Sequence, residues 1–281
     1  MPVRVVESKQ NARLKELRKA LSSPGRGVGA LVGIEGPKLI EEALRAGLRV
    51  KTIFVAQSPD RALERILEKL SLPRETEILH LPKKLLDQAL ATETPQSIAA
   101  LIEPPRWSWS HVLNQNQEKT LVIVLAGLQD PGNLGTILRS AEAFGATGVV
   151  SLPGTVSAWN TKAVRASTGS VFRVPLIAAS EADCFARLHE AGVTISATTS
   201  RGAKSADCVD LTGPVALVIG NEGNGVPGAL AAHADSTITI PFPGPVESLN
   251  AAVAASVLLY EASRQRAALN VGTSKSRGAR Q

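Results

Sequence analysis

The chain has 281 residues, 44% of them hydrophobic and 3% aromatic, so it suits one large domain or two ordinary ones with cores of Ala, Val, Leu and Ile. It has no apolar run of about 18 residues, and its charged N-terminus lacks the apolar segment of a signal peptide, so no membrane association is expected. The net charge of +6 mildly favours a polyanionic partner. Cys184 and Cys208 lack metal-ligand spacing, which predicts buried free thiols, no metal and a cytoplasmic location.

A first module is predicted over residues 1–103. It opens with a charged helix over 11–21 and a turn at 24–29, after which strand and helix patterns alternate. Strands are predicted at 30–36, 50–56 and 76–82, and the helices that follow them at 37–47, 60–70 and 83–91. This alternation is typical of an α/β layer structure. Residues 104–119 are rich in Pro, Asn and Gln without periodicity, which predicts a linker.

A second module, over residues 120–268, begins with the continuous apolar run 121–128, typical of a strand buried on both faces. The next helix, predicted from Leu134, buries one face and leaves Thr136, Arg139 and Ala143 on another. Further strands are predicted at 148–154, 171–177, 193–199, 214–220 and 236–241, and further helices at 160–169, 182–192, 227–234 and 248–268. Repeated βα units predict a mainly parallel sheet. The basic tail, 269–281, is expected to be disordered.

Three strand–loop–helix corners stand out in the second module, at residues 130–146, 218–227 and 240–255. Each is rich in Gly, Pro or Asn and carries isolated polar residues among small neighbours. In parallel α/β sheets, ligands bind beyond the carboxyl ends of the strands, so the three corners suggest one composite site.

Other sites that use glycine-rich loops fit the sequence poorly. Residues 223–228 formally match the GxGxxG dinucleotide fingerprint, but Pro227 removes an N–H where the pyrophosphate would bind. No strand ending in an acidic residue follows about 20 positions later, as that fingerprint requires. Phosphate loops of the Gly-Lys-Ser/Thr kind, GxSxG and HExxH are also absent from the sequence.

The motifs at the corners resemble one family. Asn133-Leu134-Gly135 with Arg139, then Gly220-Asn221-Glu222-Gly223, then Ser248-Leu249-Asn250 are similar to the three signature motifs of the SpoU/TrmH branch of the SPOUT RNA methyltransferases. The match covers roughly residues 120–266, and residues 1–103 more weakly resemble the family's substrate-binding domain. The resemblance implies an α/β fold with a C-terminal trefoil-knotted SPOUT domain and mainly parallel sheet. It also implies a smaller N-terminal α/β, ribosomal-protein-like domain, and a homodimer that acts on RNA.

The resemblance further implies that S-adenosylmethionine binds bent in the knot, held mainly by main-chain groups of three loops. The cofactor-binding residues expected on this basis are Thr198, Thr199, Ile219, Gly220, Asn221, Ile240, Pro241, Ser248 and Leu249. Small residues would let the backbone approach the ligand closely. Any one glycine of these loops, taken alone, could instead be an ordinary turn residue.

The implied reaction is methyl transfer to a ribose 2′-hydroxyl, a weak nucleophile that needs a base or strong polarisation. The expected catalytic residues are Arg139, Asn133, Glu222, Ser248 and Asn250. An arginine normally keeps its proton, so Arg139 either loses it in an unusual site or orients the phosphate and polarises the hydroxyl. Asn133 and Ser248 are also plausible N-caps, and Arg139 would complete the partner subunit's site.

The sequence therefore predicts a cytoplasmic, homodimeric RNA 2′-O-methyltransferase. Ribosomal RNA is the expected substrate, with transfer RNA as the alternative, and base methylation is the less favoured reaction. An inactive RNA-binding protein of the same fold is the alternative from another class.

Overall fold

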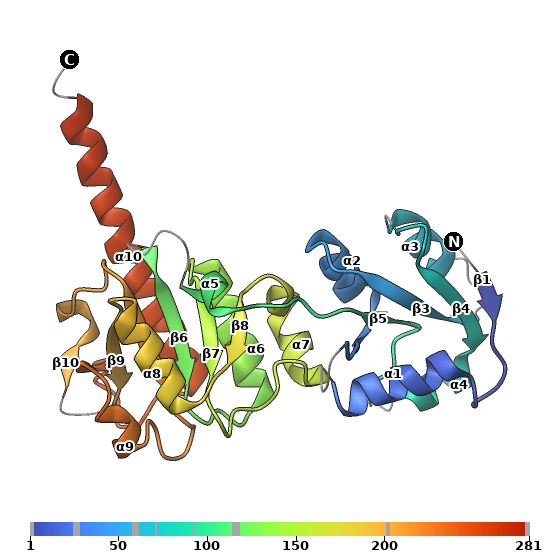
Figure 1. Cartoon of the computed structure of the whole chain (residues 1–281), viewed down its shortest axis with the longest axis horizontal. Helices are drawn as coiled ribbons and strands as arrows, with labels where there is room; N and C mark the ends of the chain where they lie inside the picture. Colours follow the sequence, from blue (N-terminus) through green and yellow to red (C-terminus); the bar gives the residue numbers. More distant parts are fainter. Residues whose placement is uncertain are drawn as a thin grey trace. The chain divides into compact units, whose positions relative to one another are not determined.

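The computed structural model describes residues 3–24, 29–57, 62–70, 72–90, 92, 94–113, 119–200 and 203–278; the side chains of 62, 63 and 270–278 are outside that description. Contacts divide the chain into two compact units. The N-terminal unit comprises residues 1–106 and 157–173, and the C-terminal unit comprises residues 107–156 and 174–281. Figure 1 traces both units along the chain, from blue to red.

The N-terminal unit is built on a five-stranded sheet of order β1-β4-β3-β5-β2. Strands β1 (Val3–Val5), β4 (Glu77–Pro82) and β3 (Val50–Gln57) pair in parallel. Strand β5 (Ile98–Ile102) runs antiparallel to both β3 and β2 (Val32–Glu35). The helices are α1 (Ala12–Ser22), α2 (Pro37–Arg45), α3 (Ala62–Lys69) and α4 (Lys83–Leu90).

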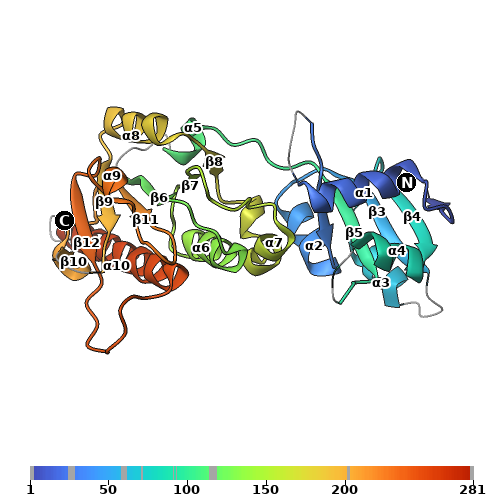
Figure 2. The same ribbon diagram turned by 90° about the horizontal axis from the view of Figure 1, so that it is seen from below.

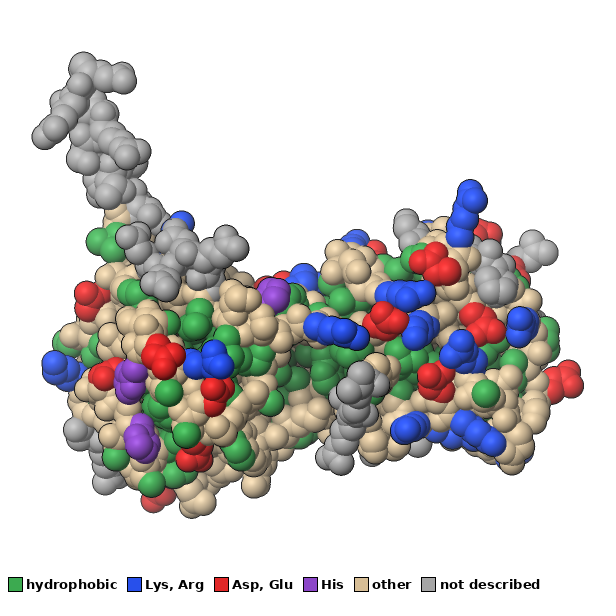
Figure 3. Space-filling view, in the orientation of Figure 1, with side chains coloured by type: hydrophobic (Ala, Val, Ile, Leu, Met, Phe, Trp, Pro, Cys, Tyr) green, Lys and Arg blue, Asp and Glu red, His purple; other side chains and the backbone are tan. Residues whose placement is uncertain are grey.

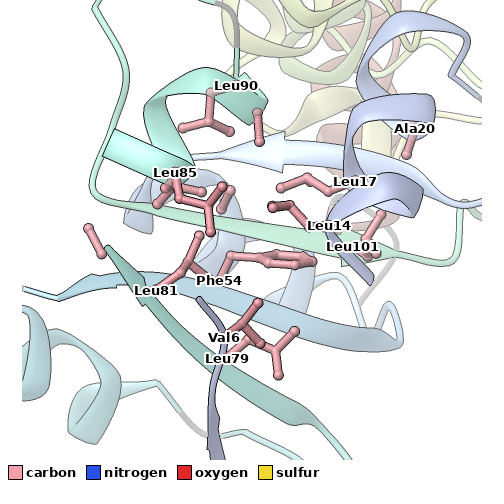
Figure 4. Close-up of a cluster of buried hydrophobic side chains, with 14 of the residues drawn as sticks. Val6, Leu14, Leu17, Ala20, Phe54, Leu79, Leu81, Leu85, Leu90 and Leu101 are labelled. Carbon is pink, nitrogen blue, oxygen red and sulfur yellow. The ribbon is translucent and has the colours of Figure 1, made fainter. Parts of the chain in front are cut away.

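Helices α1 and α4 bury their apolar sides against one face of this sheet (Figure 4). Leu14 and Leu17 of α1 lie three residues apart, so they project from one side of the helix onto Phe54 and Leu101. All four side chains are fully buried. The charged side of α1 consequently faces solvent, as its amphipathic pattern predicted.

Two strands of the N-terminal unit are missing from the prediction, β1 and β5. All five residues of β5 are buried, because the strand lies in the sheet interior between β3 and β2. The run is only five residues long, contains two alanines and ends just before the predicted linker, so it was not recognised as a strand. Strand β1 is a three-residue edge strand with exposed side chains, so its pairing with β4 leaves no hydrophobic pattern in the sequence.

The C-terminal unit contains a seven-stranded sheet of order β10-β12-β9-β11-β6-β7-β8, and every neighbouring pair is parallel. The strands are β6 (Leu121–Leu125), β7 (Gly148–Ser151), β8 (Leu176–Ala178), β9 (Thr194–Thr198), β10 (Lys204–Ser205), β11 (Val215–Ile219) and β12 (Ser236–Thr239). All residues of β6 and β11 are buried, as expected for central strands covered on both faces. The prediction of a mainly parallel sheet is confirmed.

Helices cover both faces of this sheet (Figure 2). On one face, side chains of α5 (Trp109–Val112), α8 (Glu181–Glu190) and α9 (Gly228–Ala231) join a single apolar cluster with the strands. On the other face lie α6 (Pro131–Ala143) and α10 (Ala251–Gly278), which pack along one another. The hydroxyl groups of Ser140 and Ser256 are 2.7 Å apart across this helix pair.

Several boundaries differ from the prediction. A strand was expected over residues 171–177. The structure instead has a 3-10 turn, Ser170–Phe172, in which Phe172 is buried, and the short strand β8 follows it. Helix α7 (Thr161–Ser167) and this turn pack with the N-terminal unit, where the Arg173 guanidinium contacts the Glu42 carboxylate at 2.6 Å. Helix α5 lies inside the expected linker, of which 114–118 are outside the described residues.

Helix α10 continues to Gly278, whereas a disordered tail was expected from residue 269; residues 279–281 are outside the described part. The chain contains no proline after 245, and an established helix propagates until a strong breaker interrupts it. Cys184 is buried as predicted, and burial raises the pKa of its thiol to about 12, but Cys208 is exposed. The described residues include no helix long and apolar enough to cross a membrane, and no cluster of metal-binding side chains.

Candidate active site

A cavity of about 540 Å³ lies beyond the carboxyl ends of three neighbouring strands, β9, β11 and β12. Its wall is formed by residues from the end of β9 and just after it (197–200), from the end of β11 and the loop that follows (219–226), and from the end of β12 and just after it (237–242). Ala231 of α9 and residues from the segment that enters α10 and its first turns (247–258) complete the wall. A fourth strand, β6, ends beside β11 and leads into α6. This is the position in the sheet at which the sequence placed the composite site.

Most of the expected cofactor-binding residues line this cavity. Those in its wall are Thr198, Thr199, Ile219, Gly220, Asn221, Ile240, Ser248 and Leu249. Pro241 is not part of that wall. It lines an adjoining cavity of about 340 Å³, which shares Ser200, Ile240, Phe242 and Glu247 with the first.

Gly220 has no space for a side chain. A Cβ atom at this position would lie 2.0 Å from the carbonyl carbon of Gly225 and 2.2 Å from the Val226 nitrogen. The loop folds back tightly here, because Asn221 and Gly225 exchange both main-chain hydrogen bonds, at 3.0 and 2.9 Å. Only glycine therefore allows the loop to form this part of the cavity wall.

Glu222 joins the loop after β11 to the start of α6. Its carboxylate accepts hydrogen bonds from the Asn133 side-chain amide at 2.9 Å and from the main-chain N–H groups of Asp130 and Gln129 at 3.3 and 3.4 Å. Partial burial raises the pKa of Glu222, but these hydrogen bonds together outweigh it and leave the pKa lowered. The Glu222 side chain is an anion at neutral pH, and its carboxylate oxygens accept hydrogen bonds from the residues at the start of α6.

Asn250 links the same network to α10. Its side-chain oxygen accepts from the N–H groups of Ala252 and Val253, so Asn250 is the N-cap of α10. Its amide group donates to the side-chain oxygen of Asn133 over 3.1 Å. Asn250, Asn133 and Glu222 thus form one chain of hydrogen bonds across all three sequence motifs.

The N-cap role that remained as the alternative for Asn133 and for Ser248 does not hold for either residue. Helix α6 begins at Pro131 and its N-cap is Asp130, whose carboxylate accepts from the Asn133 N–H at 2.8 Å. Asn133 therefore lies in the first turn, where its side chain is free to bridge Glu222 and Asn250. Ser248 precedes α10 by more than one residue and lines the cavity. A proline at the first helical position marks the true start of α6.

The side chain of Asn221 stabilises the loop after β11 with two hydrogen bonds. Its amide donates to the Gly127 carbonyl at 2.9 Å, and its side-chain oxygen accepts from the Gly223 N–H at 2.8 Å. The sequence had assigned Asn221 to the cofactor alone. Asn221 lines the cavity, and its side chain also connects this loop to the loop after β6 through Gly127, which no sequence motif singled out.

Arg139 is exposed on α6, as its position in the helical pattern predicted. Within the described residues it forms no hydrogen bond or ion pair, and it is not part of the cavity wall. Its guanidinium group is therefore available to a group from outside its own chain.

Comparisons with known proteins agree with this geometry. Residues 120–260 match the SpoU rRNA methylase family, and residues 34–108 match a domain described as RNA 2′-O ribose methyltransferase substrate binding. The 23S rRNA (guanosine(2553)-2′-O)-methyltransferase RlmP of Bacillus subtilis is 32% identical over 259 residues, which cover 91% of this chain and 97% of the relative.

Solved structures are similar over nearly the whole chain. The AdoMet-bound rRNA methyltransferase from Sinorhizobium meliloti superposes with a TM-score of 0.79 at 32% identity, covering 93% of this chain and 98% of the other. The SpoU methyltransferase AviRb from Streptomyces viridochromogenes, in complex with AdoMet, has a TM-score of 0.77 at 29% identity, covering 92% and 98%.

The fold and the site define the chain as an S-adenosylmethionine-dependent RNA methyltransferase that acts on a ribose 2′-hydroxyl. It belongs to the SpoU rRNA methylase family. The resemblance inferred from the three motifs is thereby confirmed, as are the enzyme class and the cofactor.

The cavity suits S-adenosylmethionine in size and chemistry. Its volume falls within the range of about 300–1,000 Å³ that is usual for small-molecule pockets. The main chains of Ile240 and Leu249 form no hydrogen bond within the described residues, so they can serve an adenine edge. The described residues that line the cavity include no Lys or Arg, which suits a ligand with a cationic centre.

Proposed function

We propose that the substrate is ribosomal RNA and that the cavity described above is the S-adenosylmethionine site. The observation that supports the site is the joining of all three motifs through Glu222, Asn133 and Asn250 at the cavity edge. The support for the substrate comes from the relatives, since RlmP of Bacillus subtilis is named for methylation of 23S rRNA. An enzyme that modifies ribosomal RNA in a bacterium would act in the cytoplasm.

Positive charge on the N-terminal unit supports its proposed role in RNA binding. Figure 3 shows Lys and Arg side chains distributed over this unit among Asp and Glu. On α1, Arg13 pairs with Glu16 at 2.8 Å and Glu77 at 3.1 Å, whereas Lys15 and Lys19 are exposed and form no ion pair within the described residues. Such cations can neutralise phosphates and release counterions.

In the proposed mechanism, the cofactor supplies an electrophilic methyl group on a sulfonium. Thr198, Thr199, Ile219, Gly220, Ile240 and Leu249 hold its adenosine part. Ser248 offers a hydroxyl in the cavity wall, and Asn133 with Asn250 keeps α6 and α10 in register beside it. Glu222 positions the loops, because its carboxylate already accepts hydrogen bonds from three donors.

Arg139 would bind the RNA phosphate and polarise the 2′-hydroxyl as a hydrogen-bond donor. When bound, S-adenosylmethionine would supply the methyl group to the ribose oxygen, and the proton of the hydroxyl that Arg139 polarises would pass to solvent. Because Arg139 lies outside the cavity wall of its own chain, we propose that it completes the site of a second copy.

An exposed apolar stripe supports this homodimer. Val253, Val257 and Tyr260 of α10 are 49%, 38% and 55% exposed, and their spacing places them on one side of the helix. The Tyr260 ring packs edge-on against Phe144, which follows α6, with centroids 5.8 Å apart. A second copy covering this stripe would bury apolar area beside the helix that carries Arg139.

The test of the proposed substrate uses purified ribosomal RNA and transfer RNA in parallel with labelled S-adenosylmethionine. Nuclease P1 digestion and mass spectrometry should locate the label on the ribose of one nucleotide in ribosomal RNA. Labelling of transfer RNA alone would show that transfer RNA, not ribosomal RNA, is the substrate. A label on a base would contradict ribose methylation.

A further inference from the structure

Glu247 lies in the loop from β12 to α10, a connection that extends away from the sheet in Figure 2. Glu247 is a lining residue of both the 540 Å³ cavity and the adjoining 340 Å³ cavity. The sequence motifs did not single it out, since it directly precedes the Ser248-Leu249-Asn250 motif.

The cavity wall contains two carboxylates in very different situations. Glu222 accepts hydrogen bonds from Asn133, Asp130 and Gln129. Glu247 is exposed and has no hydrogen bond or ion pair within the described residues. Among the described residues that line the cavity there is no Lys or Arg, so none of them compensates the charge of Glu247.

An uncompensated anion in a binding wall favours a ligand that brings positive charge. S-adenosylmethionine carries a sulfonium and an α-ammonium against one carboxylate, so its net charge is +1. The product, S-adenosylhomocysteine, keeps the ammonium but has a neutral thioether in place of the sulfonium. The two ligands therefore differ by one positive charge next to the transferred methyl group.

We propose that Glu247 recognises the sulfonium charge of S-adenosylmethionine and so makes the site bind the cofactor more tightly than the product. This inference rests on the proposed placement of the cofactor in the 540 Å³ cavity. Methyl transfer leaves the carbon–sulfur electron pair on sulfur and removes the charge that Glu247 attracts. Loss of this charge in the reaction therefore weakens binding of S-adenosylhomocysteine and promotes its release.

The effect falls on binding, not on the chemical step. An attraction to the sulfonium is strongest before transfer, because that charge is already diminishing in the transition state. Removing Glu247 should therefore raise the Kd and KM for S-adenosylmethionine without lowering kcat. It should also increase inhibition by the product relative to the affinity for the cofactor.

The test is calorimetric titration of Glu247→Gln with three ligands. These are S-adenosylmethionine, S-adenosylhomocysteine and sinefungin, an analogue with an ammonium group where the cofactor has its sulfonium methyl. We expect the first and third to bind about threefold to fivefold more weakly, as for an exposed ion pair, and the second to be unchanged. The wild-type preference for the cofactor over the product should fall with added salt, and that salt dependence should disappear in the variant.

Glu190→Gln is the matched control, since Glu190 is an exposed carboxylate of α8 that does not line either cavity. It should leave all three affinities unchanged. Equal weakening of all three ligands by Glu247→Gln would assign Glu247 to the shared ammonium and overturn the proposal, as would no weakening at all. Gly220→Ala tests the cavity separately: if it binds all three ligands normally, the proposed cofactor site itself is wrong.

Discussion

The side-chain amide of Asn133 donates a 2.9 Å hydrogen bond to the carboxylate of Glu222, a residue 89 positions further along the chain. Asn133 belongs to the first turn of α6 and Glu222 to the loop after β11. The pair joins the side of the site that would receive RNA to the wall of the cofactor cavity. Its integrity should therefore affect activity, stability and their dependence on pH.

Replacing Glu222 by Gln should make the stability of the protein depend less on pH in the acid range. The pKa of Glu222 is lowered in the folded state, so its ionised form contributes stability above the unfolded pKa of about 4.5. That contribution is lost as the pH falls through the still lower folded value. Since the group is exposed, the wild type should exceed Glu222→Gln by only about 1–2 °C in Tm at pH 7.

Thermal unfolding followed by circular dichroism between pH 3 and pH 7 measures this difference, which should shrink at the acid end. A gap that stays constant with pH would show that the charge of Glu222 is not involved.

Arg139→Ala should abolish methyl transfer while leaving the Kd for S-adenosylmethionine within about twofold of the wild type. The side chain is exposed and outside the cavity wall, so its loss leaves the cofactor site intact. Rapid-quench assays and titration calorimetry separate the two effects. A mixed dimer of Arg139→Ala with Gly220→Ala should regain part of the activity, because one composite site would then be complete; no recovery would place Arg139 in its own chain's site.

Gly220→Ala should weaken S-adenosylmethionine binding by about tenfold or more. The added Cβ would meet the Gly225 carbonyl carbon at 2.0 Å, so the loop must shift and the cavity wall with it. Gly228→Ala is the matched control, because a Cβ there meets nothing within 4 Å. Similar affinities for the two variants in calorimetric titration would contradict the assigned site.

Arg266→Ala should destabilise the C-terminal unit by about 1–3 kcal/mol, because its guanidinium donates to four main-chain carbonyls. These belong to Lys119, Thr120, Leu211 and Gly213, and burial lowers the pKa of Arg266. Arg264 of the same helix pairs only with Glu261 at the surface, so Arg264→Ala should change stability by less than about 0.5 kcal/mol. Denaturant unfolding measures the stability change of each variant, and equal changes would contradict a special stabilising role for the Arg266 hydrogen bonds.

Val257→Lys should convert the proposed dimer to a monomer, since it places a charge in the exposed stripe of α10. Val5→Lys is the control, because Val5 is 61% exposed on β1 of the N-terminal unit and outside the stripe. Sedimentation velocity measures the mass of each. A Val257→Lys protein that stays dimeric would require another interface.

Much of the fold was predictable from local patterns. The buried run of β6, the amphipathic α1 and the exposed face of α6 with Arg139 each follow from the spacing of apolar residues along one segment. Strand β5 escaped prediction because its apolar run is short and contains two alanines beside the linker, and β1 because an edge strand of three residues buries almost nothing. The start of α6 was misplaced because an Asn was taken for the cap that Asp130 provides.

The sequence by itself determined the family, because its three motifs resemble the signature motifs of that family, and the same resemblance implied the cofactor and the expected site residues. Only the tertiary structure decided how those motifs work together. The hydrogen bonds from Asn250 to Asn133 and on to Glu222 join segments 117 and 89 residues apart, and no local spacing encodes such contacts. The same holds for Glu247, because only the folded chain shows that the described residues around it in the cavity wall include no Lys or Arg.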